Sequence, residues 1–355
     1  NLAVAKTMTG DYEGAKEDAK KALEKNASAE LIKNIKSNLA PQYIRTADYD
    51  QALKMLETSA LTSTSKYNMG LTQLLTKDFD GLVLKNEIKG IHVISENDKE
   101  VLISAGAGEN WHAFVMHCIN NNWAGIENLS LIPGSVGASP MQNIGAYGVE
   151  IKDVFDHLKA LHITTGEIHT FDAPSCAFGY RESVFKRKLK GQYIICEVAF
   201  KLNKKPNKNT SYGAIEQELV KKGITDPNIR EISDAVISIR ASKLPNPALL
   251  GNAGSFFKNP IITLALAEEL IEKFPDAPNY PSTEGMRKLA AGWLIEKAGW
   301  KGYRRSNLGV HKDQALVLVN YGGSTGNEVY QLSSDIIDSV KEMFGVTLER
   351  EVNIL

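Results

Sequence analysis

The pattern of apolar and polar residues changes near residue 74 of the chain. Residues 1–73 are rich in Ala, Lys, Glu and Leu at helical spacing and poor in strand signals, which predicts an all-α segment. Two stretches, TGDYEGAKEDAKKALEKN from Thr9 and TADYDQALKMLETSAL from Thr46, share a turn, an acidic-Tyr pattern and an apolar helical face. Their spacing resembles the ~34-residue period of tetratricopeptide helix pairs. An ordinary helical hairpin fits equally well, because such arrays need about three repeats.

After residue 74 the chain alternates short β-branched runs with amphipathic helical stretches. The strands that this pattern predicts are 81–86, 90–97, 100–108, a hairpin over 158–171 with a Thr-Gly turn, 193–202, 314–320 and 346–355. The predicted helices are 109–122, 213–223, 232–242, 262–274, 288–298 and 325–345. This order indicates an α+β protein, with a sheet-rich domain followed by a smaller α/β domain.

A long uncharged segment, LSLIPGSVGASPMQNIGAYG (129–148), separates the first strands from the hairpin. Its glycines, its prolines, Gln142 and Asn143 exclude a membrane span. Loops of this length in compact domains are usually functional or disordered, and disorder usually needs charge or low complexity. We therefore expect a binding loop, whose glycines let backbone N–H groups approach a phosphate or a flat polar ring.

Composition limits the classes of function. The 355 residues suffice for two or three domains, and 41 basic against 42 acidic residues give no overall field for nucleic acid or anionic membrane. The cysteines Cys118, Cys176 and Cys196 are odd in number and form no C-x-x-C pair, which favours buried free thiols, a reducing compartment and no metal site. No apolar run reaches transmembrane length, so we expect a cytoplasmic protein without a membrane span.

Ser255 lies in GNAGSFFKNP (251–260), between a predicted Gly-Asn-Ala-Gly turn and two phenylalanines. A serine nucleophile needs a base, yet none of the seven histidines lies in a triad motif. Ala253 and Phe257 also replace the glycines of a G-x-S-x-G elbow. Ser255 is therefore either a structural turn residue or a proton donor in a site whose harder chemistry belongs to a cofactor.

Eight motifs follow one another between about residue 74 and residue 355: AGAGENWHAFV, GIENLSLIPGSVGASPMQNIGAYGVE, FGYRESVFK, GNAGSFFKNP, FPDAPNYP, KLAAGWLIEKAG, VHKDQALVLVN and LEREV. In their order and spacing they resemble the UDP-N-acetylenolpyruvoylglucosamine reductases of peptidoglycan precursor synthesis, in the longer-loop form. The resemblance implies a vanillyl-alcohol-oxidase-like FAD-binding domain over 74–243 and a substrate-binding domain over 244–355 with a returning C-terminal strand. Residues 1–73 would then replace the usual N-terminal FAD subdomain.

The family reaction implies NADPH and FAD as cofactors and a UDP-sugar as substrate, UDP-N-acetylglucosamine enolpyruvate, which is reduced to UDP-N-acetylmuramate. By resemblance, Ser255 donates the proton, and Arg181 and Glu351 engage the substrate carboxylate and the developing charge. Guanidinium suits this role because its planar fork pairs with a carboxylate. From spacing alone, Arg181 would instead form an ion pair with Glu182 or Asp172, and Glu351 would be an exposed strand charge.

The resemblance also assigns binding residues, each of which would otherwise be an ordinary surface or turn residue. The positions that match substrate contacts are Tyr212, Lys243, Asn259, Tyr280 on the covering loop, Gln314 and Tyr147. The positions that match the flavin-binding loop are Pro133, Gly134, Ser139, Ile144, Gly145 and Gly148.

The sequence departs from the family at its N-terminus. Relatives carry a glycine-rich Gly-x-Gly-Ser-Asn turn against the flavin pyrophosphate, and residues 1–73 contain none. We therefore expect weaker FAD binding and lower activity. The alternative is a repeat-type interaction protein, whose helical segment binds protein and whose reductase-like part is an inactive remnant.

Overall fold

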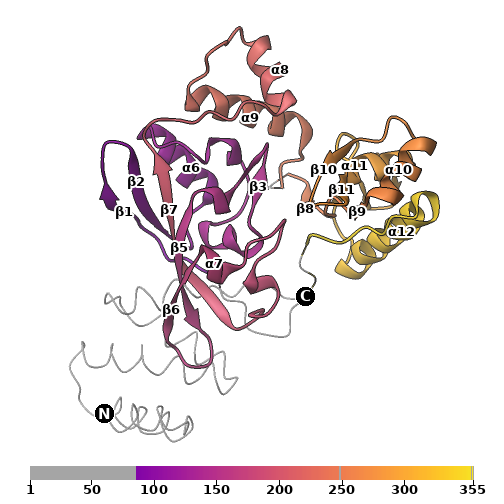
Figure 1. The fold of residues 1–355 in the computed structure, drawn as a ribbon. Coiled ribbons are helices and arrows are strands. Elements are labelled where there is room, and N and C mark those ends of the chain that lie inside the picture. Colours follow the sequence, from indigo (N-terminus) through magenta and orange to yellow (C-terminus); the bar gives the residue numbers. More distant parts are fainter. Residues whose placement is uncertain (1–84, 248, 353, 355) are drawn as a thin grey trace, which may run out of the picture. The chain divides into compact units, whose positions relative to one another are not determined.

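A computed structural model describes residues 85–247, 249–352 and 354 of the chain (Figure 1). The repeat-like segment and most of the strand expected over 81–86 lie outside these residues. The described chain forms two compact units, one of residues 85–209 with 228–230 and one of residues 210–227 with 231 onward. Each unit is described by itself below.

A five-stranded antiparallel sheet organises the first unit, in the order β1-β2-β7-β5-β6 (Figure 1). Its strands are β1 (Ile91–Glu96), β2 (Glu100–Gly106), β5 (Phe155–His162), β6 (Ile168–Asp172) and β7 (Tyr193–Asn203). The predicted hairpin is confirmed as β5 and β6, joined through Gly166 at a φ of +74° that glycine adopts without strain.

Helix α6 (Trp111–Asn120) packs its apolar side into the core of this unit. The helix begins where the Asn110 side chain accepts a hydrogen bond of 2.9 Å from the Ala113 N–H. Trp111 and Phe114 then meet Phe200 of β7, with ring centroids 5.1 to 5.9 Å apart. The predicted helix over 109–122 is confirmed, with shorter ends.

Short elements order the uncharged loop and the residues on either side of it. These elements are the 3₁₀ turns η1 (Glu127–Leu129), η2 (Val136–Ala138), η3 (Pro140–Gln142) and η4 (Ile151–Asp153), and the hairpin of β3 (Gly145–Ala146) and β4 (Val149–Glu150). Helix α7 (Ala173–Cys176) and the turn η5 (Val184–Lys186) follow the β5–β6 hairpin.

The second unit holds two small sheets and five helices among its described residues. A four-stranded sheet has the order β12-β13-β14-β8, and a three-stranded sheet has the order β10-β11-β9. The strands are β8 (Gly251–Ser255), β9 (Ile261–Thr263), β10 (Asn279–Pro281), β11 (Met286–Leu289), β12 (Arg304–Arg305), β13 (Leu308–Val310) and β14 (Val317–Asn320). The helices are α8 (Gly213–Lys221), α9 (Ile229–Lys243), α10 (Leu264–Lys273), α11 (Ala291–Lys297) and α12 (Gly326–Phe344).

Helix α12 matches its prediction closely. It starts at a capping box of Thr325 and Glu328 and ends at Gly345, whose φ is +68°. One side of the helix is buried in the core of the unit, through Leu332, Ile336, Val340 and Phe344. The 3.6-residue spacing of these residues is the signal that the sequence carried.

Several predicted elements are wrong in kind or in their bounds. Residues 251–254, predicted as a turn, belong to the strand β8. The strand expected over 346–355 does not form among residues 346–352, where Arg350 makes only an isolated bridge to Phe257. The helices expected over 262–274 and 288–298 begin later, because their first residues pair as β9 and β11. Lys85 and Asn86, the described end of the strand expected over 81–86, lie in no strand.

The three cysteines are buried free thiols, as predicted. Burial raises the pKa of Cys176 from 9.0 to about 12 and also raises that of Cys118 and Cys196. Because iodoacetamide reacts with the thiolate, its reaction with native Cys176 at pH 8.5 should be slower than with the denatured chain by roughly three orders of magnitude. Mass spectrometry of the alkylated peptides measures this ratio; rapid labelling of the native protein would contradict the burial.

Among the described residues, no helix combines the length and the apolar character needed to span a bilayer. No group of three or more His, Cys, Asp or Glu side chains in the same part of the chain could hold a metal ion.

Candidate active site

The uncharged loop is attached to the end of β2 by backbone hydrogen bonds. The N–H groups of Trp111, Val136 and Gly137 donate to Gly134, Glu109 and Ala107 at 3.0, 2.8 and 2.9 Å. Gly137 allows this approach, because a Cβ there would lie 2.5 Å from the Ala107 Cβ. These hydrogen bonds therefore fix residues 134–137 of the loop against the segment that follows β2.

Pro133 and Gly134 form the exposed edge of this loop. Gly134 has a φ of +121°, and a Cβ at this position would meet no atom within 4 Å. Within the described residues, the N–H groups of Gly134 and Ser135 donate to no backbone carbonyl. An exposed glycine backbone whose N–H groups have no backbone partner suits the close approach of an anionic or flat ligand. This part of the chain fits a flavin cofactor.

Ser139 and Ile144 lie deeper in the loop. Ser139 is buried, its hydroxyl donates to the Val136 carbonyl at 2.7 Å, and its own carbonyl accepts from the Ile144 N–H at 3.1 Å. These hydrogen bonds join residues of the loop to one another and so fix its backbone conformation.

Tyr147 lies at the tip of the β3–β4 hairpin. Tyr147 and Gly148 both have positive φ, +50° and +79°, which is the conformation of a two-residue type I′ turn. The buried Asn128 holds this tip, because its Nδ2 donates to the carbonyls of Tyr147 and Asn209 at 3.0 Å each. Gly145 starts the hairpin, and its carbonyl accepts from Arg181.

Arg181 lies in a tight turn and points toward the β3–β4 hairpin. Its Nη2 donates to the Gly145 carbonyl at 2.6 Å, and its Nη1 is 4.0 Å from the Glu150 carboxylate. The two carboxylates expected from spacing have other contacts: Glu182 pairs in a bidentate manner with Arg187, and Asp172 caps α7. Glu150 is therefore the carboxylate that this structure places beside Arg181, and sequence spacing did not indicate it.

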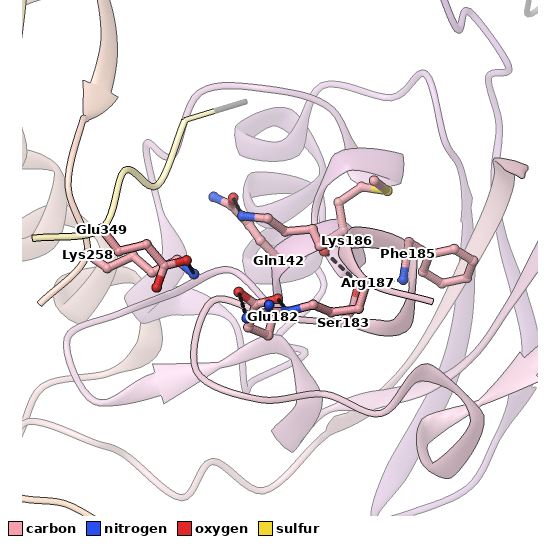
Figure 2. A network of polar contacts seen from close by, with 9 residues as sticks. Gln142, Glu182, Ser183, Phe185, Lys186, Arg187, Lys258 and Glu349 are labelled. Atoms are coloured by element: carbon pink, nitrogen blue, oxygen red, sulfur yellow. Dashed lines mark hydrogen bonds and ion pairs between the residues drawn. The ribbon is translucent and has the colours of Figure 1, made fainter. Parts of the chain in front are cut away.

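Figure 2 shows how the segment after Arg181 is attached to the loop. The Ser183 hydroxyl donates to the Met141 carbonyl at 2.6 Å, and the Lys186 ammonium donates to the Gln142 side chain at 3.3 Å. The flavin-loop residues and the Arg181 turn thus form one connected structure within the first unit.

Ser255, in the second unit, ends the strand β8 at a bulge. Ser255 pairs with Val317 and Asn252 pairs with Val319, so β8 has two residues between these pairs where β14 has one. Gly254 accommodates the bulge with a φ of +72°. Ser255 is half-buried, and its hydroxyl has no hydrogen-bond partner among the residues that the structure describes. Gly254, which the sequence analysis assigned to a turn, therefore lies in the bulge that precedes Ser255.

Glu351 is hydrogen-bonded through its backbone to Phe256, the residue that follows Ser255. The Glu351 N–H donates to the Phe256 carbonyl at 2.8 Å, and the Lys258 N–H donates to the Glu349 carbonyl at 2.9 Å. Residues 349–351 therefore run along residues 256–258 as a short antiparallel pair, with Phe257 and Arg350 opposite each other. The structure thus brings the two predicted catalytic residues of this unit onto adjacent backbone.

Lys258 is a residue that the sequence analysis missed. It is only 6% exposed, and its ammonium lies 2.7 Å from the carboxylate of Glu349, whose side chain is 65% exposed (Figure 2). A charged residue inside SFFKNP was the available signal, because a lysine among apolar residues is seldom buried without a partner. This ion pair reinforces the backbone pairing that positions Glu351.

Replacement of Lys258 with Met should loosen the segment 349–351. Met keeps the buried volume, and Glu349 stays solvated, so the fold should persist. Loss of one charge-assisted hydrogen bond, of about 1.5 kcal/mol, should raise amide hydrogen exchange of Glu351 about tenfold. The matched control is Lys273→Met, which removes an exposed pair with Glu269. Equal exchange of Glu351 in both variants would contradict the role of Lys258.

Asn259 and Gln314 each lie near the start of α11. The Asn259 Oδ1 accepts from the Ala291 N–H at 2.9 Å. The Gln314 Oε1 accepts from the Leu316 N–H at 3.4 Å and lies 3.6 Å from the position of a Cβ on Gly292. Both predicted substrate residues therefore lie near the first residues of α11, and Asn259 also satisfies a helix-terminal N–H group.

Tyr212, Tyr280 and Lys243 lie on the surface of the second unit. The pKa of Tyr212 is raised, mainly by the partial burial of this half-exposed side chain and secondarily by the charge of Tyr280. Lys243 ends α9, and its ammonium forms no ion pair with any residue that the structure describes.

Two family descriptions match the chain. One, for the FAD binding domain, matches residues 59–172, and another, for the C-terminal domain of UDP-N-acetylenolpyruvoylglucosamine reductase, matches residues 246–355. The first match begins upstream of the boundary expected at residue 74.

Curated relatives with the name UDP-N-acetylenolpyruvoylglucosamine reductase match most of the chain. The protein of Amoebophilus asiaticus is 53% identical over 85% of this chain and 90% of its own length. The protein of Flavobacterium johnsoniae is 48% identical over 89% of this chain and 94% of its own length. The solved structure of the Thermus caldophilus reductase aligns with a TM-score of 0.48 and 22% identity, over 70% of this chain and 71% of that chain.

Proposed function

The chain belongs to the family of UDP-N-acetylenolpyruvoylglucosamine reductases, and we propose that it reduces UDP-N-acetylglucosamine enolpyruvate to UDP-N-acetylmuramate with NADPH and FAD. The observation that carries this proposal is the identity of about half of the aligned residues to reductases matched over at least 90% of their own length. The placement of Ser255 supports it, since a half-buried hydroxyl with no hydrogen-bond partner among the described residues is not paired with a base, and so suits a proton donor better than a nucleophile. Both UDP-sugars and NADPH are cytoplasmic compounds, so we place the activity in the cytoplasm.

The flavin would lie against the loop whose exposed edge is Pro133 and Gly134. The glycines at 134, 145 and 148 leave the backbone accessible, while Ser139 and Ile144 fix the loop from within. When bound, FAD accepts hydride from NADPH and delivers it to the substrate double bond. The protein supplies position, charge and the proton.

Ser255 completes the reduction in this proposal. Hydride adds to the terminal CH2 carbon of the enolpyruvyl group, which leaves an enolate-like charge on the carbon next to the carboxylate. The Ser255 hydroxyl gives its proton to that carbon, and the lactyl ether results. Arg181 binds the substrate carboxylate and Glu351 assists at the developing charge. The role of proton donor requires that the Ser255 hydroxyl is not hydrogen-bonded to another group of the protein.

The remaining residues would bind the UDP-sugar. Lys243 suits the diphosphate, because it is an exposed point charge without an ion-pair partner in the described part of the chain. Tyr212 and Tyr280 present exposed phenol groups for the nucleotide, and Asn259 and Gln314 present amides at the start of α11. Tyr147 contributes from the tip of its hairpin.

The alternative, a repeat-type interaction protein with an inactive remnant, is not favoured. Relatives of about 50% identity are reductases over most of the chain. A protein-binding role of residues 1–73 stays a prediction, which a pull-down with that segment would test.

The direct test of the proposal is substrate-dependent oxidation of NADPH. With saturating FAD, the purified chain should oxidise NADPH in the presence of UDP-N-acetylglucosamine enolpyruvate. UDP-N-acetylglucosamine, which lacks the double bond, should give only the background rate. Equal rates with the two compounds would contradict the proposed substrate.

A further inference from the structure

The turn that carries Arg181 is closed at both ends but strained in the middle. Gly179 and Glu182 exchange backbone hydrogen bonds of 3.1 and 3.3 Å, so Arg181 is the third of four residues. Its φ is +55°, in the left-handed region that residues with a Cβ enter at an energetic cost. Such a conformation persists only where surrounding contacts fix it. The contacts around this turn must therefore hold Arg181 in place.

Asn143 makes the central contact. Its side chain is 0% exposed, and its Nδ2 donates to the Gly179 carbonyl and to the Glu150 carboxylate at 3.0 Å each. Its Oδ1 accepts from the Lys152 N–H at 3.1 Å. Both donors and the acceptor of one buried amide are therefore used, which fixes its orientation.

The two groups that accept hydrogen bonds from Asn143 are also the ones that fix the backbone and the side chain of Arg181. Gly179 is the first residue of the Arg181 turn, and Glu150 is the carboxylate 4.0 Å from the Arg181 guanidinium. Glu150 is itself fixed by a capping box with Asp153 and an ion pair of 2.9 Å with Lys152. Asn143 thus couples the backbone of the turn to the electrostatic partner of its side chain.

We propose that Asn143 is a positioning residue, which presents the Arg181 guanidinium to the substrate carboxylate. This inference rests on the role proposed above for Arg181. The Ser183 hydroxyl acts in the same way at the exit of the turn, through its bond of 2.6 Å to the Met141 carbonyl. Without these contacts the turn can leave its strained conformation, and the guanidinium loses its fixed direction.

The test measures binding of two UDP-sugars by calorimetry on the FAD-saturated full chain. UDP-N-acetylmuramate carries the carboxylate, and UDP-N-acetylglucosamine lacks it. Asn143→Asp keeps the acceptor for Lys152 but sets a second carboxylate against Glu150. This variant should weaken the binding of UDP-N-acetylmuramate about ten- to a hundredfold, the effect of one misplaced charge-assisted hydrogen bond. It should leave the binding of UDP-N-acetylglucosamine unchanged.

Two further variants make the test specific. Ser183→Ala should lower the same affinity ratio by a smaller factor, and it decides the matter if Asn143→Asp fails to fold. Glu182→Gln, in the same turn but paired with Arg187, should leave the ratio unchanged. An unchanged ratio in the folded Asn143→Asp or Ser183→Ala protein overturns the proposal.

A double-mutant cycle separates positioning from a general structural effect. In an Arg181→Gln background the carboxylate-dependent gain should already be lost, so Asn143→Asp should add nothing. An equal effect of Asn143→Asp in both backgrounds would contradict this inference alone. A wild-type chain that binds both UDP-sugars equally would overturn the role of Arg181, and the inference with it.

Discussion

Ser255→Ala is expected to slow the reoxidation of reduced flavin by the enolpyruvyl substrate by roughly two to four orders of magnitude, the usual contribution of a positioned acid. Reduction of the flavin by NADPH should stay nearly unchanged, because that step needs no proton from Ser255. Stopped-flow absorbance of the flavin measures the two half-reactions separately.

Two further variants distinguish proton donation by Ser255 from a purely structural role. Ser255→Cys restores an acidic hydrogen at the bulge of β8 and should recover part of the lost rate, which a purely structural serine would not predict. Ser238→Ala removes a hydroxyl that donates to Glu218 and should change neither half-reaction. Equal losses in both half-reactions of Ser255→Ala would assign Ser255 to cofactor binding or folding.

Replacement of residues 1–73 with a family-type N-terminal subdomain should tighten FAD binding by roughly two to four orders of magnitude. The added Gly-Ser-Asn turn would supply backbone donors to the flavin pyrophosphate. Two charge-assisted hydrogen bonds of about 1.5–3 kcal/mol each account for a gain of this size. Titration of FAD by fluorescence quenching measures both dissociation constants.

The matched control is the same chimera with its Gly-Ser-Asn turn changed to three alanines. It should bind FAD about as weakly as the unmodified chain, which separates the turn from the rest of the subdomain. Tight, stoichiometric binding of FAD by the unmodified chain would contradict this prediction. It would mean that residues 1–73 hold the pyrophosphate in another way.

The parts of the fold that could be predicted are those in which local pattern and tertiary packing agree. Helix α12 carries its apolar residues at helical spacing between a capping box and a glycine, so its sequence alone specifies it. The β5–β6 hairpin combines alternation with a Thr-Gly turn in the same way.

The errors arise where pairing with distant residues decides the structure. The glycines of 251–255 favour a turn locally, yet pairing with β14 makes this segment a strand with a bulge. Residues 262–263 and 288–289 fit the helical pattern, but they belong to β9 and β11, which pair with each other. Short edge strands depend on these partners more than on propensity.

The candidate site divides in the same manner. Ser255, Arg181 and Glu351 lie in motifs that a family resemblance can match. Asn143, Glu150 and Lys258 act through contacts with Gly179, Arg181 and Glu349, and such long-range partners leave no periodic signal. A buried polar residue in an uncharged or apolar segment is the clue that a sequence can offer.

One measurement tests the central claim most directly. The chain, with saturating FAD and without oxygen, is reduced by one equivalent of NADPH, and UDP-N-acetylglucosamine enolpyruvate is then added. We predict that the oxidised flavin spectrum returns and that the UDP-sugar gains the mass of two hydrogens. Flavin that stays reduced, with the UDP-sugar unchanged in mass, would contradict the assignment of this chain as an enolpyruvyl reductase.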